Sequence, residues 1–242
     1  MSGPGSRCTG VILAGGAARR FGGRPKGLES VDGLRIIDRV ARALRLVTDD
    51  LLLVANAPDA ATWLPGVRTV ADRRPGAGAL AGIETALLET RTDILIVAWD
   101  MPFVSGALLG LLRATGASEQ VDAVLPESDS SRRGVEPLCA WYATRCLDAV
   151  SAALDRGDHR VVGFHEAVRV HRLPVDRVAA FGDPARLFGN VNTPEDLAGL
   201  RASGGATSAP HTSHASHASH ASHTSHTSHA THTSSATDRA DA

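Results

Sequence analysis

The residue types best suited to chemistry gather in a segment that follows a short apolar run. Residues 10–28 read GVILAGGAARRFGGRPKGL, so a β-branched run ends at Gly15 and is followed by glycines, arginines and Lys26. Glycine lets backbone amides approach an anion, while Arg and Lys add charge and hydrogen-bond donors. The pattern predicts a strand followed by a polyphosphate-binding loop, although a solvated surface turn can have the same composition.

Lys26 is the only lysine of the chain, beside 24 arginines. A lysine ammonium is a compact point charge that contacts phosphate where a planar guanidinium does not fit. The segment contains neither the G-x-x-x-x-G-K-[ST] pattern of a P-loop nor the G-x-G-x-x-G pattern of a dinucleotide site. We therefore expect a phosphate loop of another kind, with Lys26 as its cation.

A carboxylate follows a second uninterrupted apolar run. Residues 94–98 read ILIVA, and Trp99 and Asp100 come directly after them. The end of a buried parallel strand faces the ligand crevice of an open α/β sheet, and aspartate is a common Mg²⁺ ligand beside phosphates. Asp100 could instead cap the next helix, but Ser105 is better placed for that role. We expect Asp100 to bind metal.

Several segments together resemble one known family. LAGG at 13–16, Arg20-Phe21-Gly22 and Lys26 resemble the signature loop of nucleotidyltransferases that activate sugar phosphates and cofactors. The chain is most similar to the MobA-like nucleotidyltransferase family, the molybdenum cofactor guanylyltransferases. DMPF at 100–103 and NVNTPEDL at 190–197 are also similar to family segments, whereas GALAG at 78–82 has alanine where the family usually has proline.

The resemblance implies a fold and a reaction. The fold would be a Rossmann-like, three-layer α/β nucleotidyltransferase domain with a mostly parallel sheet. The reaction would transfer GMP from GTP to the terminal phosphate of the molybdenum-pterin cofactor, forming the guanine dinucleotide cofactor and releasing pyrophosphate. Mg²⁺ would be the metal, and GTP and the molybdenum-pterin cofactor the bound partners. Transient contact with enzymes that deliver or accept the cofactor is also implied.

The resemblance further implies the roles of individual residues. The nucleotide would be held by Leu13, Ala14, Gly15, Gly16 and Lys26. Arg20 and Lys26 would lie against the triphosphate charge, and Asp100 would bind Mg²⁺. Asn56 and Asp72, each at the end of a predicted strand, would contact the guanine or its ribose. Asn190 and Asn192 would lie near the metal or the acceptor phosphate.

The elements that must position these residues alternate along the chain. Hydrophobic periodicity predicts strands at 11–13, 51–55, 67–70, 94–98, 121–125 and 136–141, an edge strand at 168–173, and helices at 36–47, 79–88, 106–112 and 144–156. A turn is expected at Val31-Asp32-Gly33, and a short helix at Asp158. Alternating strands and helices predict βαβ units with a parallel sheet. Thr193, followed by Pro194 and Asp196, predicts the N-cap of a further helix.

Composition narrows the possible partners and surroundings. Residues 1–202 contain 24 basic and 24 acidic side chains once Asp238, Arg239 and Asp241 are set aside, so no basic excess indicates nucleic-acid binding. Neither a signal-peptide core nor a run of membrane-spanning length is present. The three cysteines lack C-x-x-C spacing. We expect a cytoplasmic protein with reduced thiols that contacts neither nucleic acid nor membrane.

The sequence divides into two parts, a nucleotidyltransferase domain at 1–202 and a tail at 203–242. The tail lacks Leu, Ile, Val, Phe, Met, Tyr and Trp, which predicts disorder. Its histidines recur every third residue from His211 to His232. This spacing fits Ni²⁺, Zn²⁺ or Cu²⁺ binding and neutral drift of a simple repeat equally well. The spacing of His159, His165 and His171 fits no metal site, and we assign them no chemistry.

Two alternative functions remain open at this point. The first is a cytidylyltransferase acting on the same cofactor, whose C-terminal motif usually lacks the first asparagine; Asn190 therefore favours guanosine. The second is a non-catalytic nucleotide- or metal-binding carrier in which the histidine-rich tail is the working part. Comparing turnover with GTP and with CTP tests the first alternative against the guanylyltransferase hypothesis. Deleting the tail and measuring transfer tests the second.

Overall fold

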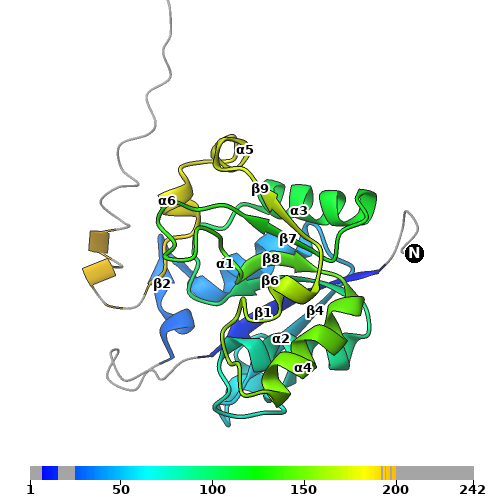
Figure 1. The fold of residues 1–242 in the computed structure, drawn as a ribbon. Helices are drawn as coiled ribbons and strands as arrows, with labels where there is room; N and C mark the ends of the chain where they lie inside the picture. Colours follow the sequence, from blue (N-terminus) through cyan, green and yellow to red (C-terminus); the bar gives the residue numbers. More distant parts are fainter. Residues whose placement is uncertain (1–6, 16–24, 192, 194, 197, 200–242) are drawn as a thin grey trace, which may run out of the picture. The chain divides into compact units, whose positions relative to one another are not determined.

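The fold is built around one seven-stranded sheet (Figure 1). The structure is a computed structural model that describes residues 7–15, 25–191, 193, 195–196 and 198–199. The strand order is β5-β4-β1-β6-β8-β7-β9. The strand bounds are β1 Cys8–Ala14, β4 Asp50–Ala55, β5 Arg68–Val70, β6 Asp93–Ala98, β7 Ala123–Pro126, β8 Cys139–Tyr142 and β9 Val170–Leu173. Every neighbouring pair is parallel except the two pairs formed by β8, so the predicted mostly parallel sheet is confirmed as a mixed one.

The central strands are apolar on both faces because both faces are covered. Successive residues of β1 enter different core clusters, Ile12 on one side of the sheet and Val11 and Leu13 on the other. Strand β6 alternates in the same way, with Leu95 and Ile96 on opposite sides. This burial explains why the sequence shows continuous apolar runs here instead of polar alternation.

Four main helices cover the sheet. Residues of α1 (Ile36–Arg45) and α3 (Gly106–Ser118) enter one core cluster, and those of α2 (Ala79–Thr90) and α4 (Leu147–Asp155) enter the other. In Figure 1, α2 and α4 lie together on one face, with α1 and α3 across the sheet from them. The shorter elements are η2 Lys26–Leu28, η3 Ala60–Thr62, η4 Thr144–Cys146, η5 His165–Ala167, α5 Val175–Ala179 and α6 Pro184–Leu187.

Local sequence signals account for two of the boundaries. The predicted turn joins the two-residue strands β2 (Ser30–Val31) and β3 (Leu34–Arg35), with positive φ at Asp32 (49°) and Gly33 (78°). The predicted cap at Ser105 is also confirmed, because its Oγ accepts a hydrogen bond from Leu108 N (3.3 Å) at the start of α3.

Two predictions in the second half of the chain were displaced. The strand expected at 136–141 is β8, Cys139–Tyr142, and it runs antiparallel to both neighbours. The helix expected at Asp158 does not form there; the Asp158 carboxylate instead accepts hydrogen bonds from the Arg160 side chain at 2.9 and 2.8 Å. The Asp158 carboxylate is therefore occupied by Arg160 and does not begin a helix at this position.

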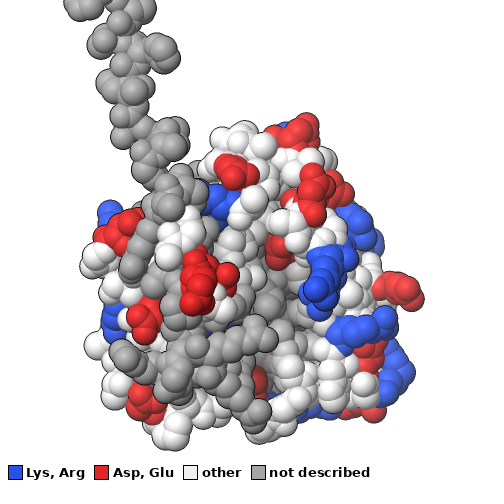
Figure 2. Space-filling view, turned by 90° about the vertical axis from the view of Figure 1, so that its left-hand side faces the viewer, with Lys and Arg blue, Asp and Glu red and all other residues white. Residues whose placement is uncertain are grey.

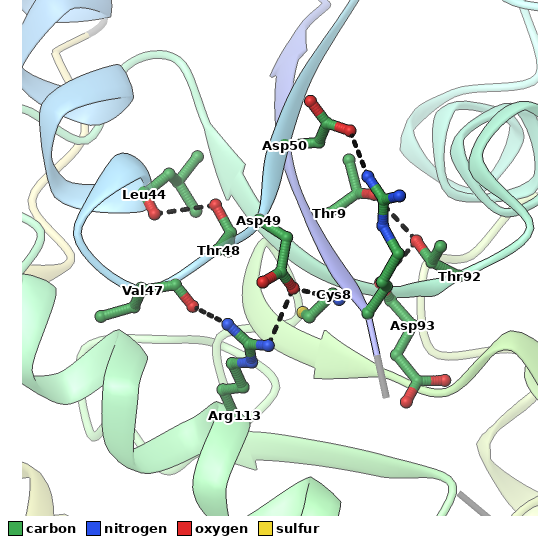
Figure 3. A network of polar contacts seen from close by, with 11 residues as sticks. Cys8, Thr9, Leu44, Val47, Thr48, Asp49, Asp50, Thr92, Asp93 and Arg113 are labelled. Carbon is green, nitrogen blue, oxygen red and sulfur yellow. Dashed lines mark hydrogen bonds and ion pairs between the residues drawn. The ribbon is translucent and has the colours of Figure 1, made fainter. Parts of the chain in front are cut away.

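A polar network closes the amino-terminal end of the central strands (Figure 3). The Asp49 carboxylate accepts hydrogen bonds from Cys8 N and from the Arg113 guanidinium, both at 2.8 Å. Arg113 also donates to Val47 O (2.6 Å). Next to them the Thr9 and Thr92 hydroxyls lie 2.8 Å apart. These bonds join α3 to β1 and to the segment before β4.

Two further predictions concern membrane-spanning segments and the carboxyl-terminal tail. Among the described residues, no helix is both long and apolar enough to cross a membrane. The predicted tail at 203–242 lies outside the described residues, and the proposed boundary with it stays a prediction.

Candidate functional site

A cavity of about 580 Å³ opens where the parallel strands β1, β4 and β6 end and the loop after β5 begins. Residues from these separate ends line it: Leu13, Gly15, Asn56, Asp72, Asp100 and, from the carboxyl-terminal segment, Asn190. Ala14 lines the same cavity. The strands are parallel and adjacent, so side chains far apart in the sequence meet at one edge of the sheet.

Lys26 and Asp100 form an ion pair beside this cavity. Lys26 Nζ lies 2.5 Å from Asp100 Oδ2, although 74 positions separate the two residues. The side chains are only 16% and 12% exposed, so the pair is shielded from water. The single lysine and the carboxylate at the end of β6 thus meet at one point, as the phosphate-site hypothesis requires.

Close backbone packing places Lys26 there. A Cβ on Gly27 would lie 2.3 Å from the indole ring of Trp99, so only glycine allows the chain to approach the ring this closely. Trp99 is buried and stacks on Trp63 with ring centroids 5.2 Å apart, which fixes the ring. Trp99 N also donates to Leu13 O (3.1 Å), joining the ends of β6 and β1. Trp99 therefore acts as the platform on which the Lys26 segment rests.

Asn56 and Asp72 form a second polar pair on the cavity. Asn56 Nδ2 donates to Asp72 Oδ2 (3.2 Å), and Asp72 N donates to Asn56 Oδ1 (2.8 Å). Asp72 Oδ1 is buried and has no hydrogen-bond partner among the described residues. Burial raises the pKa of Asp72, and the bond from Asn56 opposes that rise. The unpartnered oxygen is suited to accept a hydrogen bond from a ligand.

The carboxyl-terminal segment is attached directly to the metal-site candidate. Val191 N donates to Asp100 O (3.0 Å), and this bond brings Asn190 to the same side of the cavity. Farther along, Thr193 Oγ1 accepts from Asp196 N (3.0 Å) and Thr193 N donates to Asp196 Oδ2 (2.9 Å). This reciprocal pair is the capping arrangement that the sequence predicted at Thr193.

The donors present suit a metal that is held mainly by its substrate. Among the described residues, no three His, Cys, Asp or Glu side chains come together as a ligand set. Asp100 supplies a carboxylate on the cavity that is only 12% exposed and follows the end of β6. Mg²⁺ beside phosphates commonly takes one or two protein carboxylates and completes its shell with phosphate oxygens and water. One aspartate facing a phosphate site fits that pattern.

Other cavity residues received no role from the sequence. Glu136, His159 and Arg160 line the side formed by β8 and the loop after α4. Burial raises the pKa of Glu136, while hydrogen bonds from Ser128 and Ser131 oppose that rise. None of these residues follows the carboxyl end of a predicted strand. The sequence pattern that identified Asp100, a polar side chain directly after a buried strand, was therefore absent for these residues.

Three expected site residues cannot be placed. Gly16, Arg20 and Asn192 lie outside the described residues.

Figure 2 shows both acidic and basic side chains on one face of the molecule, with basic ones gathered toward the right of the view. The face in this view is therefore not uniformly basic.

Comparison with known proteins agrees with this architecture. The sequence model of the MobA-like NTP transferase domain matches residues 10–170. A molybdenum cofactor guanylyltransferase of Desulfosudis oleivorans is 34% identical over 197 residues, covering 81% of this chain and 95% of the relative.

Two solved structures extend the comparison. Molybdopterin-guanine dinucleotide biosynthesis protein A of Archaeoglobus fulgidus is 28% identical with a TM-score of 0.69, covering 81% of this chain and 98% of that one. A Mycobacterium tuberculosis protein solved in complex with manganese is 21% identical with a TM-score of 0.57, covering 82% and 100%. This last likeness concerns the fold.

Proposed function

The chain belongs to the MobA-like nucleotidyltransferase family, and from this premise we propose that it transfers GMP from GTP to the terminal phosphate of the molybdenum-pterin cofactor. An oxygen of the acceptor phosphate attacks the α-phosphorus of GTP. The bond from the α-phosphorus to the oxygen that bridges it to the β-phosphorus breaks, and pyrophosphate leaves with that oxygen. The product is the guanine dinucleotide form of the cofactor.

One observation carries the proposal more than any other: the ion pair of Lys26 and Asp100 at the edge of the cavity. Phosphoryl and nucleotidyl transfer require charge neutralisation and alignment of the reacting groups. A cation and a metal-binding carboxylate from separate segments, side by side, supply both. Relatives named as guanylyltransferases then indicate which nucleotide and which acceptor.

The phosphate end of the site is formed by the end of β1 and by Lys26. Leu13, Ala14 and Gly15 line the cavity, and no atom lies within 4 Å of the position that a Gly15 Cβ would take. A phosphate can therefore approach the main chain closely. Lys26 balances triphosphate charge, and by resemblance Gly16 and Arg20 complete this loop. In the structure Lys26 contacts Asp100, so nucleotide binding exchanges that contact for one with phosphate.

The metal in this proposal is Mg²⁺, with Asp100 as its protein ligand. A divalent cation between phosphate oxygens would withdraw charge from the phosphate that is attacked and from the leaving group. Asp100 is held in place from two sides, by the strand β6 before it and by the bond from Val191 N to its carbonyl. Asn190, on the same cavity, would orient the acceptor phosphate, with Asn192 beside it by resemblance.

The nucleoside end of the site is formed by Asn56 and Asp72. Asp72 Oδ1 is the buried acceptor without a partner, and guanine offers N–H donors at N1 and N2. We propose that Asp72 accepts from the guanine or from its ribose, and that Asn56 holds the carboxylate in position through its two bonds. A contact with the guanine favours GTP, because cytosine lacks the adjacent pair of donors, whereas a contact with the ribose is the same for GTP and CTP.

The proposal includes a cytoplasmic location, where GTP and reduced thiols are found. Cys8, Cys139 and Cys146 are free and buried in the described fold, and burial raises the pKa of each thiol. Enzymes that deliver or accept the cofactor would dock only transiently. The thiols take no part in the proposed reaction.

Incubation of the full chain with molybdenum-pterin cofactor, Mg²⁺ and each α-labelled nucleoside triphosphate tests this function. We expect label to enter the cofactor from GTP, with pyrophosphate released in equal amount. A clear preference for CTP would overturn the guanylyltransferase assignment. A chain ending at residue 202 should keep the transfer activity, and loss of transfer on truncation would mean that the tail takes part in the reaction. GTP binding by the full chain without any transfer would favour the non-catalytic carrier.

A further inference from the structure

Two neighbouring arginines in the loop after β5 form ion pairs whose acidic partners differ in burial. Arg73 pairs with Glu89 near the surface, Nη2 to Oε1 at 2.7 Å. Arg74 pairs with Glu84 through two parallel bonds, Nε to Oε2 at 2.8 Å and Nη2 to Oε1 at 2.9 Å. The Glu84 side chain is 3% exposed and that of Glu89 is 22% exposed. Glu84 is therefore the only buried carboxylate of the two, while its partner Arg74 remains 37% exposed.

Glu84 is unusual for its position in α2. The neighbouring residues Ile83, Ala86 and Leu87 are fully buried and apolar, so Glu84 lies on a helix that packs on the sheet. Burying a carboxylate is costly unless it is paired and hydrogen-bonded, and a hydrophobic residue would often be more stable there. The retained carboxylate therefore indicates a task that a hydrophobic side chain could not perform.

That task is to hold the loop between Asp72 and the start of α2. Arg74 O accepts a hydrogen bond from Ala77 N (3.1 Å), which closes the turn leading to Gly78. A second buried side chain of α2 supports the loop, since Thr85 Oγ1 accepts from Arg73 N (3.0 Å). The loop is thus fixed from beneath by two polar residues of α2.

The held loop forms one wall of the nucleotide cavity. Asp72 precedes the anchored arginines, and Gly76 and Gly78 follow them; all three line the cavity. Both glycines have positive φ, 87° and 77°, so the backbone here adopts a conformation that depends on the turn being held. A shift of Arg74 would move the Asp72 carboxylate and the first amides of α2 together.

We propose that the Arg74–Glu84 pair is a positioning device for nucleotide binding: it sets the loop 72–78 at the place where the base and ribose are held. This inference rests on the proposed function for the identity of the ligand. Arg74 and Glu84 do not touch the reacting phosphate, so their loss weakens GTP binding far more than it slows transfer from bound GTP. Arg74 also reaches Asp155 of α4 (2.6 Å), which is 65% exposed and adds little to the anchor.

The variant Glu84→Gln keeps the shape of the side chain and removes its charge. We expect it to raise the KM for GTP about tenfold with kcat changed less than about twofold, because one charge-assisted pair is lost away from the reacting atoms. Amide hydrogens of residues 72–80 should exchange faster in the variant without any ligand. Arg74→Lys, which keeps the charge but loses the parallel bonds, should fall between wild type and Glu84→Gln.

Glu89→Gln and Asp155→Asn are the matched controls, since each removes a partner of the same two arginines that is more exposed than Glu84. Both should keep the wild-type KM and exchange pattern. Identical behaviour of Glu84→Gln and Glu89→Gln would overturn the inference, as would a fall in kcat with unchanged KM. If Glu84→Gln does not fold, Arg74→Lys must still raise the KM for GTP with kcat nearly unchanged, and an unchanged KM counts against the device.

The two proposals can fail separately. Wild-type protein that binds GTP but labels no cofactor refutes the proposed reaction, while exchange and GTP affinity still decide the role of the loop. Wild-type protein that transfers GMP, together with a Glu84→Gln variant that binds GTP normally, refutes only the positioning role.

Discussion

The two ends of the central strands differ in how completely their polar groups are partnered. At the amino-terminal end, Asp49 receives bonds from Cys8 N and Arg113, and the Thr9 and Thr92 hydroxyls bond to each other (Figure 3). At the carboxyl end, Asp72 Oδ1 and Trp99 Nε1 are buried without partners among the described residues.

An unpartnered buried polar atom costs about 1–3 kcal/mol. Of the three such atoms among the described residues, two lie at the carboxyl end of the central strands, and the third, His165 Nε2, belongs to η5. The concentration at the carboxyl end indicates a use for these atoms there. The closed end stabilises the fold, and the open end is stabilised by what it binds. Substitutions at the two ends should therefore have opposite signatures. Those at the open end should reduce activity more than stability, and those at the closed end should do the reverse.

The largest effect is expected at Asp100. Asp100→Ala removes the proposed metal ligand, and transfer of GMP should fall by about a thousandfold or more. The far-ultraviolet circular dichroism spectrum should stay that of the folded protein, because α and β elements do not depend on this side chain. Transfer at the wild-type rate by a folded Asp100→Ala protein would show that the metal lies elsewhere.

Lys26→Ala should have the next largest effect. Loss of the only lysine leaves one triphosphate charge unbalanced, and the KM for GTP should rise about 10- to 100-fold. Steady-state kinetics with varied GTP measure this. Lys26→Arg is the matched variant: a partial return of affinity is expected, since the charge returns in a bulkier, planar form. An unchanged KM in Lys26→Ala would remove Lys26 from the phosphate site.

Asp72→Asn should separate function from stability at the open end. We expect the KM for GTP to rise about tenfold as a charged acceptor is lost. Because burial raises the pKa of Asp72, its ionised form disfavours the empty fold at neutral pH, so the variant should be as stable as wild type or up to about 0.5 kcal/mol more stable. This gain should vanish as pH falls through the raised pKa. Denaturant unfolding at several pH values measures it, and a less stable variant at neutral pH would contradict the account.

Asp49→Asn at the closed end should show the reverse pattern. The bond from Cys8 N, with the nearby Arg113, lowers the pKa of Asp49 in the fold. The charge therefore stabilises the protein above the ordinary aspartate pKa, and this contribution is lost as pH falls through the lowered value. We expect a loss of about 1 kcal/mol at neutral pH for this partly exposed group, with kcat and KM unchanged. A clear loss of activity would mean that the closed end is coupled to the site.

Several strands and helix caps could be predicted because they depend on local sequence patterns. The apolar runs ending at Ala14 and Ala98 predicted buried strands, and Ser105 and Thr193 predicted the caps that form. The expectation that Lys26 and Asp100 meet came from the rule that parallel strands present their ends at one edge of the sheet. The catalytic and binding roles of these residues stay predictions.

Other features could not be predicted, because they depend on packing between distant segments. Strand β8 is antiparallel owing to its place between β6 and β7, which no local pattern encodes. The Gly27–Trp99 contact and the Arg74–Glu84 pair likewise need tertiary structure before they can be recognised. Glu136 and Arg160 reach the cavity from loops and therefore carried no strand-end signal.

The structure of the protein bound to GTP and Mg²⁺ would test the central claim most directly. The account predicts the triphosphate against the backbone at Leu13–Gly15, with Lys26 Nζ moved from Asp100 to a phosphate oxygen and Asp100 bound to the metal. Asp72 Oδ1 should accept a bond from the guanine or ribose. A nucleotide bound away from the carboxyl ends of β1 and β6, with the Lys26–Asp100 pair intact, would contradict it.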